Sequence, residues 1–197
     1  IPQTARTEKG MAITTMVDPY SYRKKLTMPK MLFMGTNDEY WTVDAIKHYI
    51  DSIPGENYIH YVPNAGHSLG DQRQALAGLS AFFGKTMARQ PYPILKWDLT
   101  QNKESVTLKV RTTPELLVDA ILWSTDSEDT DFRDETWAGK SVELKKKNNE
   151  VVTAVQPFPE AGYRAFYLDL KYKDTNGGEF TESTRMFVSD PDEVFLK

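Results

Sequence analysis

Two short apolar runs, Met31–Met34 and Tyr58–Val62, constrain most strongly what this chain can fold into. The first run does not alternate between apolar and polar residues, which is typical of a strand buried on both faces of a parallel sheet. A segment with helical spacing of apolar residues follows each run, over 43–53 and then over 71–87. The order predicts a βαβα unit.

Apolar residues at helical spacing define one face of each predicted helix. These faces consist of Val43, Ile46, Ile50 and Ile53 in the first helix, and of Leu76, Leu79 and Phe83 in the second. Thr42 is the expected N-cap of the first helix, which Pro54 and Gly55 should end. Before the first strand, Asp18 and Pro19 predict a short helical turn opened by an aspartate cap.

Two parallel strands with their helices leave apolar edges and faces that further strands must cover. We therefore expect either another segment of the same protein or a second copy of the molecule to complete the sheet. The chain begins Ile-Pro-Gln rather than with methionine, which favours a segment of a longer protein. Such a segment could arise by processing, by engineering or by proteolysis.

The pattern changes after Pro91-Tyr92-Pro93, which reads as a linker. Alternating segments predict strands over 105–111, 117–124, 141–144, 151–155, 163–172 and 180–188. Asp174-Thr175-Asn176-Gly177-Gly178 predicts a hairpin, because asparagine and glycine tolerate the positive φ of a tight turn. We interpret the chain as a βαβα part over 1–90 and an antiparallel β-sandwich of immunoglobulin or fibronectin type over 91–197.

Composition excludes several classes of function. Twenty-eight acidic against 24 basic side chains give a net charge of -4, which is not the basic footprint of a nucleic-acid binder. No apolar run approaches the length of a membrane span. The absence of cysteine excludes disulfides and thiolate metal sites, and we expect no cofactor.

An acidic cluster offers oxygen ligands for calcium, although a solvated loop is the favoured interpretation. Its members are Asp126, Glu128, Asp129, Asp131, Asp134 and Glu135.

Asp38 and His67 are the candidate catalytic residues. Asp38 follows the first strand, His67 follows the second, and the carboxyl ends of adjacent parallel strands lie side by side. The order, acid before histidine, matches the α/β-hydrolase triad, and we therefore interpret residues 1–90 as the C-terminal part of an α/β-hydrolase-like domain. In such a triad a carboxylate orients the imidazole, which takes the proton of the nucleophile and returns it to the leaving group.

Each residue also has an ordinary structural interpretation. Asp38 can cap the following helix, and a histidine on a loop is commonly a surface residue. His48 and His60, on a helix and within a strand, are not expected to be catalytic. Tyr40 and Trp41 could line a substrate pocket, but packing at the helix start is the favoured interpretation.

The nucleophile of the predicted triad is missing from the sequence. The G-x-S-x-G motif that exposes a catalytic serine does not occur, and Ser80 in Gly78-Leu79-Ser80 lies within the second predicted helix. Ser68 adjoins His67 and cannot easily face its ring. We therefore expect the chain alone to be inactive, with the nucleophile on sequence that precedes it.

Several stretches resemble the PhoPQ-activated pathogenicity-related family, which includes the autocrine proliferation repressor proteins. They are 16–22, 28–41 and 63–69, together with Leu122-Trp123-Ser124, Asp131-Phe132-Arg133 and Trp137. The resemblance implies a longer protein with an α/β-hydrolase-like domain ahead of a β-rich one, exported to the periplasm or secreted. It implies that Asp38 is the acid and His67 the histidine, and it brings no defined substrate.

We therefore interpret the chain as part of a serine hydrolase of esterase or peptidase type, acting on a small molecule or peptide. The rival hypothesis is a non-catalytic secreted or envelope protein that uses the hydrolase fold as a scaffold for binding or signalling.

Overall fold

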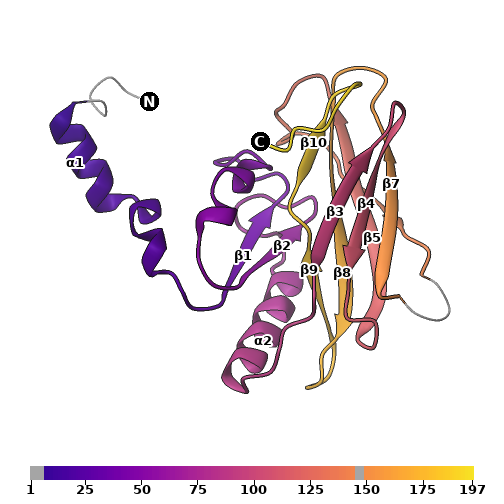
Figure 1. Cartoon of the computed structure of the whole chain (residues 1–197), viewed down its shortest axis with the longest axis horizontal. Helices are drawn as coiled ribbons and strands as arrows, with labels where there is room; N and C mark the ends of the chain where they lie inside the picture. The colour runs from indigo at the N-terminus through magenta and orange to yellow at the C-terminus, as the bar shows by residue number, and fades with distance from the viewer. Residues whose placement is uncertain (1–6, 145–148) are drawn as a thin grey trace.

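The computed structural model describes residues 7–144 and 149–197. They form an α/β fold with few helices and mostly antiparallel strands (Figure 1). A parallel pair of strands and α2 adjoin two antiparallel sheets, while α1 (Glu8–Val17) projects from the rest and buries no residue. None of the described helices is long and apolar enough to cross a membrane.

The two predicted strands are present as β1 (Lys30–Gly35) and β2 (Asn57–Val62). They pair in parallel, with Gly35 opposite Val62. Within the described residues β1 pairs with β2 alone. The α/β-hydrolase-like extension of this pair stays a prediction.

The predicted turn before β1 is also present, as the 3-10 helix η2 (Pro19–Lys25). Asp18 Oδ1 accepts a hydrogen bond from the backbone N–H of Tyr20 at 3.0 Å, which caps the turn as expected.

The α-helix predicted over 43–53 is wrong in type. The segment forms two 3-10 helices, η3 (Ala45–His48) and η4 (Ile50–Ser52), separated by Tyr49 with a φ of -138°. The apolar spacing still has its expected effect, because Val43, Ile46 and Ile50 are buried. β-Branched side chains lose rotamer freedom in an α-helix, and short i→i+3 turns bury the same side chains.

The second predicted helix is α2 (Arg73–Met87), but it buries a face other than the apolar one. Leu76 and Phe83 are 57% and 58% exposed. The buried residues are Ala75, Gly78, Ala81 and Lys85. Ala75, Gly78 and Ala81 are small and let the helix approach β2 closely, since a Cβ on Gly78 would lie 3.3 Å from His60 Nδ1.

The remaining strands are antiparallel, as predicted. They are β3 (Lys96–Gln101), β4 (Ser105–Arg111), β5 (Leu117–Ser127), β6 (Ala138–Ser141), β7 (Val151–Pro157), β8 (Tyr163–Lys173), β9 (Glu179–Ser183) and β10 (Phe187–Ser189). The predicted hairpin joins β8 to β9, with Gly177 and Gly178 at φ 100° and 87°. The strand β3 was not predicted, and the strand predicted over 141–144 lies earlier, as β6.

A bulge divides the strand predicted over 180–188. β9 and β10 both pair with β8, but the three residues 184–186 stand opposite only two residues of that strand. The backbone N–H of Leu168 donates to Thr184 Oγ1 at 3.0 Å at this point. An extra residue of this kind interrupts the ladder and bends the strand.

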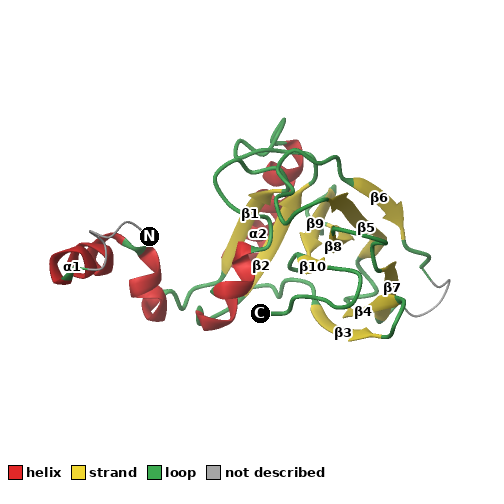
Figure 2. Ribbon diagram, turned by 90° about the horizontal axis from the view of Figure 1, so that it is seen from above, coloured by secondary structure: helices red, strands yellow, loops and turns green. Residues whose placement is uncertain are grey.

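The five-stranded sheet, formed by β5, β6, β8, β9 and β10, lies between two other layers (Figure 2). On β8 alternate side chains serve different cores, because Phe166 and Leu168 pack with β4 and β7, whereas Ala165 and Tyr167 pack with the β1–β2 side. The two antiparallel sheets thus share one apolar core. Their immunoglobulin or fibronectin type, and the division at residue 91, stay predictions.

Asp169 on β8 should make the stability of the fold depend on pH. Burial raises its pKa from 3.8 to about 7, even though Ser183 Oγ donates a hydrogen bond to it at 2.6 Å. Between these two values the unfolded chain has lost a proton that the folded chain keeps, so the free energy of unfolding declines as the pH rises from about 4 to about 7.

We expect Asp169→Asn to remove this decline. Its urea midpoint should exceed that of the wild type at pH 8 and equal it near pH 3.5. Asp98→Asn, on the exposed strand β3, is the matched control and should follow the wild type at both values. A lower midpoint for Asp169→Asn at pH 8 would contradict the assignment.

Candidate functional site

The carboxyl ends of β1 and β2 bring Asp38 and His67 together. Asp38 lies in the loop that leaves β1, and His67 lies in the loop that leaves β2. The loops meet at Gly35, where a Cβ would lie only 2.2 Å from the carbonyl oxygen of Ala65. Only glycine fits at this point, so it permits the two loops to approach.

The Asp38 carboxylate and the His67 ring are in direct contact. His67 Nδ1 lies 2.8 Å from Asp38 Oδ2, and the backbone N–H of Tyr40 donates to Asp38 Oδ1 at 2.9 Å. Burial raises the pKa of Asp38, but the hydrogen bonds from His67 and Tyr40 lower it more, so the pKa lies below its usual value. An ionised carboxylate beside Nδ1 favours the proton on that nitrogen and leaves Nε2 as an acceptor.

Two neighbours from the acid loop hold the histidine. Glu39 Oε2 accepts a hydrogen bond from the backbone N–H of His67 at 3.1 Å, which lowers the pKa of Glu39. The Tyr40 ring meets the imidazole edge-on, with ring centroids 5.0 Å apart. The His67 side chain is still 57% exposed, so its ring is accessible to another molecule.

The loop between β5 and β6 reaches across to the acid loop. Asn37 Nδ2 donates to the carbonyl oxygens of Arg133 at 2.9 Å and Glu135 at 2.7 Å. Arg133 Nη1 in turn donates to the carbonyl oxygen of Glu39 at 3.2 Å. We call residues 131–137 the bracing segment.

The bracing segment also holds the histidine loop. Asn64 Nδ2 donates to the carbonyl oxygen of Trp137 at 3.0 Å, and the backbone N–H of Trp137 donates back to Asn64 Oδ1 at 2.8 Å. Asn64 adopts a left-handed φ of 55°, and its own N–H donates to Thr36 Oγ1 at 2.8 Å. One segment of the β-rich half therefore fixes both loops.

Two carboxylates of the predicted acidic cluster bind arginines. Arg133 Nε donates to Asp131 Oδ1 at 2.7 Å, and this hydrogen bond contributes most to lowering the pKa of Asp131 to about 2. Arg164 Nη2 donates to Asp126 Oδ2 at 2.6 Å. Within residues 7–144 and 149–197, no group of three or more His, Cys, Asp or Glu side chains is placed to hold a metal ion.

An apolar hollow of about 760 Å³ opens beside Asp38 and His67. Its apolar walls come from both sides of the acid loop and include Leu32, Phe33, Met34, Trp41, Val43, Ala45, Ile46 and Leu69. The volume lies within the range typical of sites for small molecules. A molecule bound there would be in contact with the histidine.

The structure also places the other residues considered from the sequence. His60 is fully buried and its Nδ1 lies 2.8 Å from the carbonyl oxygen of Thr181, while His48 is exposed. Tyr40 and Trp41 are 69% and 66% exposed; the Tyr40 ring packs against that of His67, and for Trp41 the favoured interpretation as a packing residue is wrong. Trp41 lines the hollow.

The residues that position the pair were not identified from the sequence. Asn37 and Asn64 occur in the two loop motifs, where they read as turn residues. An asparagine directly beside a candidate acid is a usable signal. The partner of Asn37, Arg133, lies 96 positions further along the chain, and the partner of Asn64, Trp137, lies 73 positions further along; neither has a local signal.

The fold and site together define an α/β protein, rich in antiparallel strands, with an Asp–His pair on two successive βα loops. A model of the PhoPQ-activated pathogenicity-related protein family matches residues 1–133, and the chain belongs to that family. Autocrine proliferation repressor protein A of Dictyostelium discoideum is 28% identical over an alignment of 199 residues, and this alignment covers 90% of the chain. The match spans 40% of the length of that relative. No solved structure matches the chain.

Asn37→Asp should destabilise the site. Aspartate keeps the acceptor for Thr36 Oγ1 but places a carboxylate against two carbonyl oxygens. We expect the free energy of unfolding to fall by about 1–3 kcal/mol in urea titrations. Asn102→Asp is the matched control, because the Asn102 side chain acts as an acceptor in its turn. Equal midpoints for the two variants would refute the bracing role.

The tautomer of His67 can be measured in the chain by itself. We expect the neutral ring to carry its proton on Nδ1, donated to Asp38 Oδ2. Long-range ¹H–¹⁵N correlation spectra should show this form in the wild type and loss of its predominance in Asp38→Asn. A wild-type ring protonated mainly on Nε2 would contradict the expected geometry.

Proposed function

We propose that Asp38 and His67 are the acid and base of a serine-hydrolase triad in an α/β-hydrolase-like sheet. The observation that carries the proposal is the 2.8 Å contact between His67 Nδ1 and Asp38 Oδ2, on loops that leave adjacent parallel strands. The buried carboxylate, the accessible ring and the adjoining apolar hollow are the further requirements of such a site.

In the proposed reaction a serine outside this chain attacks the carbonyl carbon of an ester or amide. His67 Nε2 takes the serine proton and then delivers it to the leaving alcohol or amine, so that an acyl-enzyme forms. Water attacks this intermediate, again losing a proton to His67, and the acid product leaves as the serine is restored. Asp38 stabilises the imidazolium formed in each half of the reaction.

The serine would come from a preceding segment of a longer parent protein. Two observations support this: β1 pairs only with β2 among the described residues, and the relative is much longer than the match. New strands beside β1 would extend the parallel sheet and cover part of the hollow. A second copy of the chain is the competing way to complete the sheet.

The substrate class in this proposal is an ester or peptide with an apolar group. The hollow next to His67 is lined mainly by apolar side chains, among them Leu32, Phe33, Val43 and Ile46. Burial of such a group against them would hold the carbonyl near the imidazole.

A non-catalytic role is the competing function. The name of the Dictyostelium relative describes an autocrine repressor of proliferation, which fits a secreted protein that acts by binding a partner. We include a periplasmic or secreted location in both hypotheses. In the second one, the Asp38–His67 contact would serve only to join two loops.

Labelling with a fluorophosphonate probe separates the two functions. The protein should be expressed from its complete gene, and the covalent adduct measured by intact mass. We expect one adduct in the wild type and a loss of labelling rate of about 10³–10⁴-fold in His67→Ala and Asp38→Asn. Asp98→Asn, a carboxylate change on the exposed strand β3, is the control and should label like the wild type.

Absence of an adduct from folded wild-type protein would overturn the catalytic proposal and favour the binding role. Equal labelling of wild type and His67→Ala would show a nucleophile that does not depend on this pair.

A further inference from the structure

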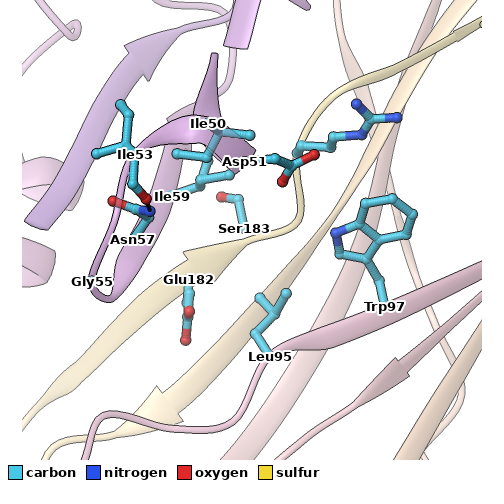
Figure 3. Close-up of a pocket in the computed structure, with 11 residues that line it drawn as sticks. Ile50, Asp51, Ile53, Gly55, Asn57, Ile59, Leu95, Trp97, Glu182 and Ser183 are labelled. Carbon is cyan, nitrogen blue, oxygen red and sulfur yellow. Dashed lines mark hydrogen bonds between the residues drawn. The ribbon is translucent and has the colours of Figure 1, made fainter. Parts of the chain in front are cut away.

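A second cleft lies toward the amino end of β2, whereas Asp38 and His67 lie beyond its carboxyl end. It has a volume of about 390 Å³ and separates η4 and β2 from the strands β3 and β9 (Figure 3). Ile50, Ile53 and Ile59 lie on one side, and Leu95 and Trp97 lie on the other. These five side chains form the apolar part of a lining that also includes Asn57 and Ser183, and they suit a small aliphatic group.

Arg185 supplies a buried positive charge to this cleft. It is 6% exposed, and its guanidinium carbon lies 5.1 Å and 5.2 Å from the ring centroids of Trp97 and Phe187. Nη2 donates to the carbonyl oxygen of Leu196 at 3.0 Å, but Nε has no partner among the described residues. A guanidinium held against two aromatic rings, with an N–H unused, is suited to a carboxylate.

Asp51 supplies the opposite charge. It lines the same cleft. Burial lowers the pKa of Arg185, and the charges of Asp51 and Asp44 act in the opposite direction. Asp44 is already paired with Lys47 at 2.6 Å. No ion pair within 4.0 Å joins Asp51 or Arg185 to any charged group in the described part of the chain.

Glu182 adds no charge to this balance. Its side chain is 3% exposed, and Oε2 has no partner in residues 7–144 and 149–197. Burial raises its pKa well above the usual value, which favours the neutral acid. The cleft thus offers one cation, one anion and an apolar wall.

We propose that this cleft binds an apolar α-amino acid in its zwitterionic form. The ligand carboxylate would bind Arg185 Nε, its ammonium would face Asp51, and a branched aliphatic side chain would pack against the isoleucines and Leu95. A zwitterion places opposite charges against Arg185 and Asp51 without adding net charge to the cleft.

The first test is titration of the 197-residue chain with L-leucine, followed in ¹H–¹⁵N spectra. The indole N–H signal of Trp97, assigned with Trp97→Phe, should shift, whereas that of Trp41 in the other hollow should not. Leucinamide lacks the carboxylate and 4-methylpentanoate lacks the ammonium, so we expect leucinamide to bind at least about tenfold more weakly and 4-methylpentanoate about threefold more weakly. No Trp97 shift, or equal binding of the three probes, would overturn the proposal.

Three variants sharpen the test. Arg185→Met should raise the Kd for leucine at least about tenfold, and Asp51→Asn about threefold, because Asp51 is exposed. Glu182→Gln, which replaces a neutral acid by a neutral amide, should stay within about twofold of the wild type.

If Arg185→Met fails to fold, the Asp51→Asn variant decides, because it should remove the preference for leucine over 4-methylpentanoate. A preference that survives would refute the assigned ammonium site.

Asp38→Asn and His67→Ala should leave leucine binding unchanged. Failure of this proposal is therefore distinguishable from failure of the hydrolase proposal, which depends on those two residues.

Discussion

The apolar contact between β2 and the face of the five-stranded sheet that points away from β3, β4 and β7 determines how the rest of the structure is arranged. Tyr61 is fully buried there, its ring centroid is 5.0 Å from that of Tyr167, and its hydroxyl donates to the carbonyl oxygen of Val43. Full burial of one such aromatic contributes on the order of 1.5–3 kcal/mol. A two-stranded sheet has little independent stability, so the parallel pair depends on this packing.

The candidate site inherits its geometry from that contact. Once β2 is fixed against β8, the bracing segment lies opposite the two loops, and Asn37 and Asn64 can reach its backbone. Trp137 and Phe132 are buried in the same cluster, which anchors the bracing segment at both ends. The β-rich half is therefore part of the structure of the site, although its sequence pattern reads as separate.

Local patterns predicted the elements that local forces determine. The apolar runs 31–34 and 58–62 became the parallel strands, and the glycines at 177 and 178 made the predicted hairpin. The same reasoning chose the wrong face of α2, because contact with β2 selects small residues rather than Leu76 and Phe83. Tertiary packing thus overrode hydrophobic periodicity where two elements approach closely.

For the candidate site, the adjacency of Asp38 and His67 follows from strand order, since parallel strands end at the same edge. Their support could not be predicted. Arg133 reads as one member of a charged loop, and its bond to the carbonyl oxygen of Glu39 exists only after the halves have packed. Long-range hydrogen bonds of this kind have no signature in a single sequence.

The segment predicted as the first α-helix forms two 3-10 helices, and this difference affects both cavities. An α-helix directs residues spaced three and four apart to one face, so it would point Val43, Ile46 and Ile50 the same way. The break at Tyr49 instead lets Val43 and Ile46 line the hollow beside His67, while Ile50 lines the cleft near Arg185. Ile53 lines both, so this short segment forms a wall shared by the two cavities.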